Sequence, residues 1–264
     1  VYAFGNGGGV LILRGGAALT DASGGGSRSL SVVSSSTLQD NALAVVLQAA
    51  NSFSGGVRVA NSLLLLDAAG ALPPGSRPMS LEAGAYLGFT ETAGMSGPGG
   101  FRSMLSPSNF SSLTLDPTAV LGLDSTQFIA GKIENSDSSP TVARFVSDKL
   151  DFSQLGPVGV GTLTKATLLG SLVGQGSGGS RSLRLLGVEG GVLEIRSRVS
   201  DVNAASLTVG GNSLLHADGK VVLDVCFYES MFRNDLNGPF GDSLPRLVRW
   251  EINPTTRTTS VTTI

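Results

Sequence analysis

The chain has 264 residues, of which 14% are charged, and its formal net charge at pH 7 is −2. Typical soluble domains carry roughly 25% charged residues. The near-neutral balance gives no basic field for a phosphate backbone, which excludes nucleic acid as a partner. No apolar run approaches the roughly 18 residues that a membrane-spanning helix needs. The 37 glycines and the frequent Ser, Thr and Asn residues favour a strand-rich surface over a helical one.

The sequence opens on Val1 with neither an initiator Met nor a signal-peptide pattern, so we expect a processed product or a part of a longer protein. Its one cysteine, Cys226, cannot form an internal disulfide. Because Val225 and Phe227 flank this cysteine, we expect it to be a small buried residue.

Short segments in which apolar residues alternate with polar ones recur along the chain, and Gly, Ser, Asn or Pro clusters separate most of them. These segments lie at residues 10–13, 30–33, 57–59, 113–115, 183–185, 192–195 and 207–209. The nearest approach to a helical repeat is at residues 38–47, where a helix and a strand both remain open. The pattern predicts an all-β chain with helix confined to short pieces.

Two short motifs recur in the same order and at nearly the same offset. Gly-Gly-Ser-Arg-Ser-Leu occurs at residues 25–30 and 178–183, and Asn-Ser-Leu-Leu at residues 61–64 and 212–215. Stacked, imperfect repetition of short strands is typical of solenoids, in which each coil buries its apolar face against its neighbours. The repetition therefore predicts stacked coils.

One stretch of the chain has a residue pattern that is known from a repeat family. Residues 51–59 read Asn-Ser-Phe-Ser-Gly-Gly-Val-Arg-Val, a leucine run begins at Leu63, and residues 70–75 read Gly-Ala-Leu-Pro-Pro-Gly. This stretch resembles the autotransporter-associated β-strand repeat. The resemblance implies a secreted bacterial parallel β-helix within a long surface protein. It departs from the family where Asn61-Ser62 replaces the glycine before the leucine strand, and it does not extend to residues 79–157.

The residue types of the same stretch also predict its local structure, independently of the resemblance. Gly55-Gly56 predicts a corner with positive φ, because glycine adopts that conformation without steric cost. Phe53, Val57, Val59 and Leu63 are the expected core residues. An ordinary β-hairpin in a sandwich remains the alternative for this stretch.

The composition changes towards the C-terminus. Residues 221–253 combine aromatic and charged side chains, which is typical of the atypical terminal unit that covers the last coil of a solenoid. The Thr-rich residues 254–264 are either disordered or an extended strand that pairs with a neighbour. We therefore expect a body at residues 1–220, a cap or docking segment at residues 221–253 and a tail. The candidate interface residues are Phe227, Tyr228, Phe232, Phe240, Arg246, Arg249 and Trp250.

Catalytic patterns are weak. Gly174-x-Gly176-x-x-Gly179 matches the dinucleotide fingerprint, but an alternating strand pattern follows where a helix is required. His216, the only histidine, precedes a turn, and no Gly-x-Ser-x-Gly elbow is present. One His and one Cys are too few for a transition-metal site. We therefore assign no catalytic, cofactor-binding or metal-binding residue.

The sequence thus predicts a right-handed parallel β-solenoid with an atypical C-terminal cap. Roughly ten to thirteen coils of ~20–25 residues would give a rod of about 50–60 Å. We expect a non-catalytic segment of a secreted or bacterial cell-surface assembly, which contacts other copies or neighbouring domains. The alternative is a carbohydrate-active or glycan-binding parallel β-helix, whose acidic residues would come from Glu189, Glu194, Asp224 and Glu229.

Overall fold

The computed structural model describes residues 1–5, 9–16, 18–35, 43–73, 75, 77–93, 100–125, 143–175, 182–199, 206–210, 219–227, 246–253 and 258–263. Strands are the main secondary structure of this part of the chain and helix is nearly absent, which confirms the all-β prediction. Its helical pieces are the short α1 (Phe101–Met104) and the 3-10 turn η1 (Pro107–Asn109). All seven predicted segments lie in strands, and the ambiguous segment at 38–47 contributes a strand at Leu43–Leu47.

The strands form three open sheets. Sheet A contains β1 (Tyr2–Gly5), β3 (Leu30–Val33), β5 (Val57–Ala60), β7 (Arg77–Leu81) and β9 (Phe110–Leu115). Sheet B contains β2 (Gly9–Leu13), β4 (Leu43–Leu47), β6 (Leu63–Leu66), β8 (Tyr86–Thr90), β10 (Val120–Asp124), β12 (Gly159–Thr162), β14 (Ser182–Gly187) and β16 (Ser206–Val209). Sheet C contains β11 (Ala143–Asp151), β13 (Lys165–Val173), β15 (Val192–Val199), β17 (Lys220–Phe227), β18 (Arg246–Asn253) and β19 (Thr258–Thr263).

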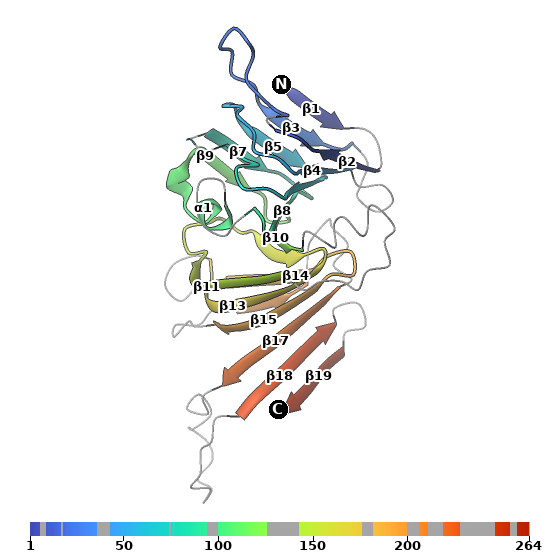
Figure 1. Ribbon diagram of the computed structural model, residues 1–264. Coiled ribbons are helices and arrows are strands. Elements are labelled where there is room, and N and C mark those ends of the chain that lie inside the picture. The colour runs from blue at the N-terminus through green and yellow to red at the C-terminus, as the bar shows by residue number, and fades with distance from the viewer. Residues whose placement is uncertain are drawn as a thin grey trace, which may run out of the picture.

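Successive strands alternate between sheets. From β1 to β17, each even-numbered strand joins sheet B, and each odd-numbered strand joins sheet A or, from β11 onward, sheet C. Neighbouring strands within each sheet are parallel up to β17. The strands therefore stack in chain order, with the two termini at opposite ends of the stack (Figure 1). Strands β7 to β10, which lie outside the family resemblance, follow the same alternation.

The main core lies between the sheets. In sheet A, Leu30, Val57 and Met79 are in register and buried. They pack in one cluster with residues of sheets B and C, including Leu64 of β6 and Leu193 of β15. Alternation along each strand supplies this inward row and leaves the intervening residues on the other face.

A second apolar cluster lies on the opposite face of sheet B. Its members include Val46, Leu65, Tyr86, Val120 and Leu186, all buried. Sheet B therefore has apolar residues on both faces, as parallel sheets commonly do.

The spacing of the stacked strands departs from the coil length that the sequence predicts. Paired residues of adjacent strands are as close in sequence as Ala44 and Leu63 or as far apart as Val120 and Gly159. Sheet B accordingly contains eight strands among the described residues, fewer than the ten to thirteen expected coils. The recurring hexapeptide does not mark equivalent positions either, because Leu30 lies in sheet A and Leu183 in sheet B.

The glycine pair at residues 55–56 has a different role from the predicted one. Neither glycine has positive φ. A Cβ on Gly55 would overlap the carbonyl oxygen of Arg28, to which the Gly55 N–H donates at 2.9 Å, so close approach of the stacked chain requires glycine here. The positive φ falls instead on Asn61, at 45°, where the family pattern has glycine. Asparagine tolerates this conformation better than most residues.

Asn51 connects three segments at this turn. Its Oδ1 accepts the Leu19 N–H at 3.0 Å, and its Nδ2 donates to the carbonyl oxygens of Ala49 and Ala71 at 3.0 and 2.9 Å. Phe53, Val57 and Val59 are buried in the main core as predicted, whereas Leu63 packs in the second cluster of sheet B.

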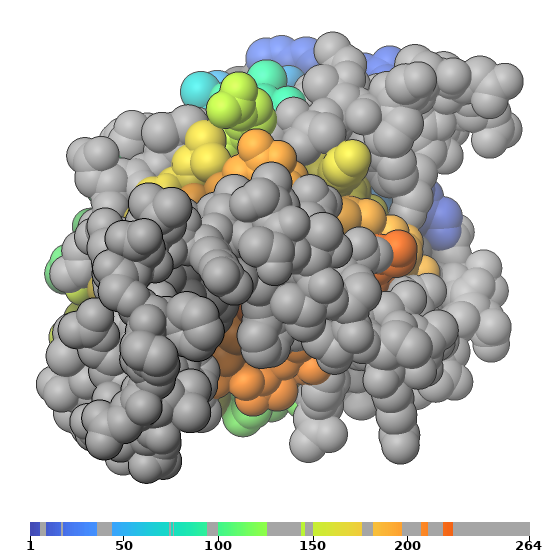
Figure 2. Space-filling model, turned by 90° about the horizontal axis from the view of Figure 1, so that it is seen from below, coloured from blue at the N-terminus to red at the C-terminus, as the bar shows by residue number. Residues whose placement is uncertain are grey.

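The parallel arrangement ends at the C-terminus of sheet C. Strand β17 begins at Lys220, at the expected boundary between body and cap, and pairs in parallel with β15. Strands β18 and β19 then pair antiparallel. The Thr-rich tail thus contributes a strand that pairs within the chain. Seen from this end, orange residues of the last third of the chain reach the surface (Figure 2).

Candidate functional site

A row of polar side chains links the ends of consecutive strands in sheet B. Arg14 Nε donates to Gln48 Oε1 at 2.9 Å, and Gln48 Nε2 donates to Asp67 Oδ2 at 2.8 Å. The other oxygen of Asp67 accepts the hydroxyls of Thr90 and Thr92 at 2.7 and 2.9 Å. We call this row the polar corner. It joins residues that follow or end β2, β4, β6 and β8, and it satisfies the nearly buried Asp67 carboxylate.

The next strand along sheet B carries a fully buried carboxylate, Asp124. Its Oδ2 accepts the Tyr86 hydroxyl at 2.6 Å, and its Oδ1 accepts the Leu163 N–H at 2.8 Å. The hydroxyls of Thr162 and Thr164 lie 3.2 and 3.3 Å from Oδ1. These contacts tie together β8, β10 and the end of β12.

Burial dominates the electrostatics of this pair. Removal from water disfavours the charged carboxylate and raises the pKa of Asp124 to about 6, although the hydrogen bonds from Tyr86 and Leu163 act in the opposite direction. Burial and the neighbouring Asp124 raise the pKa of Tyr86 well above its ordinary value. Because both side chains are fully buried, the pair joins strands and offers no accessible group to a substrate.

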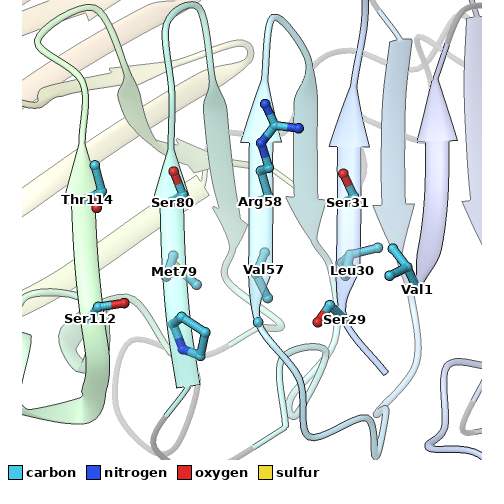
Figure 3. Close-up of a pocket in the computed structure, with 12 residues that line it drawn as sticks. Val1, Ser29, Leu30, Ser31, Val57, Arg58, Met79, Ser80, Ser112 and Thr114 are labelled. Carbon is cyan, nitrogen blue, oxygen red and sulfur yellow. The ribbon is translucent and has the colours of Figure 1, made fainter. Parts of the chain in front are cut away.

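An open hollow lies on the outer face of sheet A, with a volume of about 360 Å³. Two rows of side chains cross its strands (Figure 3). The first row is Ser31, Arg58, Ser80 and Thr114, which are in register. The second contains the paired residues Pro78 and Ser112, and Ser29 and Gly56 also line the groove. We call this surface the hydroxyl groove. The residues between the rows, Leu30, Val57 and Met79, are buried in the core.

Arg58 is the charged side chain that lines the groove. Its Nε and Nη2 donate to the two carboxylate oxygens of Glu82 at 2.6 and 2.8 Å. The hydrogen-bonded carboxylate raises the pKa of Arg58, and the guanidinium lowers the pKa of Glu82. The two side chains are 52% and 38% exposed, so water screens their attraction, and the pair mainly orients Arg58.

Four of the candidate interface residues lie in the described strands β17 and β18. Trp250 is paired with Leu223, whose side chain is in the main core. Arg249 is paired with Asp224, and Arg246 with Phe227. Tyr228, Phe232 and Phe240 lie outside the described residues.

The other sequence candidates give no reactive constellation that the structure describes. His216 and Glu229 lie outside the described residues, and Cys226 lies in β17. The glycine motif that opens at Gly174 is followed by strand β14, in agreement with its rejection as a dinucleotide site. In the described part of the chain, no group of three or more His, Cys, Asp or Glu side chains is placed to hold a metal ion.

The alternative acidic residues are dispersed. Glu194 is nearly buried, accepts the Thr167 hydroxyl at 3.0 Å and forms an ion pair with Arg196 at 2.9 Å. Glu189 lies in a turn with φ of 51°.

Sequence reasoning missed both the Asp124 pair and the hydroxyl groove. Tyr86 and Asp124 lie 38 positions apart in the sequence, and no local pattern joins them. For the groove a signal existed, since Ser31, Arg58 and Thr114 occupy the outward positions of predicted strands.

Among the described helices, none is long and apolar enough to cross a membrane.

Comparisons with protein-family models, with curated proteins and with solved structures yield no match for this chain.

Proposed function

We propose that the chain is a right-handed parallel β-solenoid that acts as a non-catalytic structural segment of a secreted, cell-surface assembly of the autotransporter-associated type. The observation that carries this proposal is the alternation of parallel strands between sheets along the whole stack. In such an arrangement each coil contacts mainly its neighbours, so the molecule can lengthen by adding coils. Right-handed connections are the rule between parallel strands of one sheet.

Side-chain hydrogen bonds between neighbouring coils support a structural role. The polar corner and Asn51 connect consecutive coils through side chains, in addition to the backbone ladders. Hydrogen bonds to buried polar groups are costly to break, because each partner would be left unsatisfied. These contacts therefore hold adjacent coils in one register.

The exposed apolar residues support contacts at the ends. Among the described residues, the exposed large apolar side chains are Val1, Val10 and Leu207, which are 81%, 47% and 41% exposed. Val1 and Val10 lie at the first strands of sheets A and B, and Leu207 lies at the last strand of sheet B. Strand edges with exposed apolar residues favour pairing with further strands. The antiparallel β18 supports a cap on sheet C, because it ends the parallel ladder.

A deletion of one coil tests the architecture. Removal of residues 57–78 joins Gly56 to Met79, which then takes the register of Val57 opposite Leu30, and Tyr86 takes that of Leu63 opposite Ala44. We expect this variant to keep its β-type circular dichroism and to shorten by about 4.8 Å in small-angle X-ray scattering.

Removal of residues 68–78 alone is the matched control. It takes away the connection from β6 to β7 together with the first two residues of β7, so this variant should unfold. If the whole-coil variant loses its β signal as the control does, the strands form one interdependent fold and the solenoid proposal fails.

The alternative, a glycan-binding parallel β-helix, is favoured by the hydroxyl groove on sheet A.

A further inference from the structure

The hydroxyl groove presents hydrogen-bonding groups that the protein itself does not use. Ser112 and Thr114 are exposed, and Ser31 is half-buried. Within the described part of the chain, the hydroxyls of these three residues have no protein hydrogen-bond partner. Ser80 is engaged, since its hydroxyl lies 3.3 Å from Glu82 Oε1. The free hydroxyls come from β3 and β9, at the two sides of the groove, with Arg58 between them (Figure 3).

Arg58 adds a fixed donor. Glu82 engages Nε and Nη2, which holds the planar guanidinium in one orientation and leaves Nη1 for a ligand. A guanidinium held in this way loses little further freedom when it donates to a ligand oxygen. The Glu82 carboxylate also balances its charge, so the groove is close to neutral, and its hydroxyls lie beside apolar lining residues such as Pro78.

This chemistry disfavours several ligand classes. A phosphate-rich ligand requires more cations than one guanidinium that is already paired. A divalent cation requires carboxylates, and the groove lining has none. An added strand requires a free sheet edge, whereas the groove lies on a face. A lipid would require a larger apolar area than Pro78 and its neighbours supply.

A neutral polyhydroxyl chain fits these features. Serine and threonine hydroxyls both donate and accept hydrogen bonds, as sugar hydroxyls do. The ring of the exposed Pro78 offers an apolar surface for the C–H face of a pyranose. The rows also repeat at the ~4.8 Å spacing of adjacent strands, which is comparable to the length of one hexose unit.

We propose that the hydroxyl groove on sheet A is a binding site for a neutral oligosaccharide that lies across β3, β5, β7 and β9. Arg58 and the hydroxyls of Ser31, Ser112 and Thr114 supply the hydrogen bonds. The site is independent of the structural role proposed above. Its loss would leave the coils intact, and unfolding of the coil-deletion variant would not disprove it.

Isothermal titration calorimetry with neutral hexasaccharides tests the site. The probes are cellohexaose, maltohexaose and mannohexaose, with hexagalacturonate as the acidic comparison. We expect at least one neutral probe to bind in the micromolar to low-millimolar range that shallow polar sites reach, and Arg58→Ala to weaken it about tenfold. Arg58→Lys should weaken binding to a similar degree, because lysine keeps the charge but loses the guanidinium fork.

Two controls separate the groove from the rest of the surface. Thr114→Ala removes a groove hydroxyl, and Thr208→Ala removes an exposed hydroxyl on β16 of sheet B. Thr114→Ala should weaken binding several-fold, and Thr208→Ala should leave it unchanged, with unaltered circular dichroism in both variants. The proposal fails if no neutral probe binds, if hexagalacturonate binds more tightly than every neutral probe, or if the two threonine variants behave alike.

Discussion

At the scale of single residues, the most unusual group is the buried Asp124 carboxylate. Most paired carboxylates have a lowered pKa in the folded state, as Glu82 and Asp116 do. In Asp124, burial outweighs four hydrogen-bonding contacts and raises the pKa from 3.8 to about 6. The folded protein therefore takes up a proton here at a pH at which the unfolded chain has lost it.

The sign of the resulting pH dependence follows from linkage. The contribution of protonated Asp124 to stability is fully present below about pH 4 and is lost as pH rises through 6. Two pKa units correspond to roughly 3 kcal/mol, an upper value for this one group. We expect the difference in free energy of unfolding between the wild type and Asp124→Asn to shift by up to that amount between pH 4 and 7.

Urea denaturation at pH 4, 5, 6 and 7 measures this difference. Comparison with Asp124→Asn cancels the opposite contributions of Glu82 and Asp116, whose lowered pKa values stabilise the fold as pH rises. In Tyr86→Phe, loss of the donated hydrogen bond should move the transition to higher pH. A difference that stays constant across this range would contradict the raised pKa.

At the scale of elements, glycines set how closely side chains cross sheet B. Gly88, Gly122 and Gly161 are in register on β8, β10 and β12. A Cβ on Gly122 would overlap the ring and hydroxyl of Tyr86, which reaches across this position to Asp124. The missing side chain thus makes room for the Tyr86–Asp124 hydrogen bond.

We expect Gly122→Ala to lower the free energy of unfolding by about 2 kcal/mol, because the buried Tyr86 ring must move. Gly16→Ala is the matched control, since a Cβ there meets nothing within 4 Å. In a Tyr86→Leu background the cost of Gly122→Ala should largely disappear, and urea denaturation of the four variants closes the double-mutant cycle. An equal cost in both backgrounds would show that the ring is not the obstacle.

At the scale of the whole molecule, the two ends of the stack differ. The N-terminal end presents the parallel strands β1 and β2, whereas sheet C ends in the antiparallel β18 and β19. Trp250 stands in register between Leu223 and Val261. The composition of this end is the one expected of a cap. Its antiparallel strand pairs end the series of parallel pairs in sheet C.

We expect deletion of residues 254–264 together with Trp250→Ala to preserve the β-type circular dichroism while weakening self-association. The physical reason is that the variant lacks both the β19 edge and an aromatic side chain of the type enriched in interface cores. Sedimentation velocity over a wide concentration range measures the change. If the double variant sediments as the wild type does at every concentration, the segment only caps the stack.

The sequence by itself determined that this chain forms strands and, where apolar and polar residues alternate, which strand residues face the main core. Alternation is a local property, so a few neighbouring residues suffice to predict that Val32, Val57 and Leu193 face the core, where all three are buried. The solenoid-like pattern of short strands also predicted that the strands would stack, and the parallel sheets agree with this prediction.

Only the tertiary structure decided which strands meet. The separation of paired residues varies from one pair of strands to the next, the repeated hexapeptide leads into different sheets, and no fixed period predicts the register. The proximity of Gly55 to Arg28 and the Tyr86–Asp124 hydrogen bond both join segments that are far apart in the sequence. The hydroxyl groove is likewise a product of register, because side chains far apart in the sequence form rows only when the four strands β3, β5, β7 and β9 are paired.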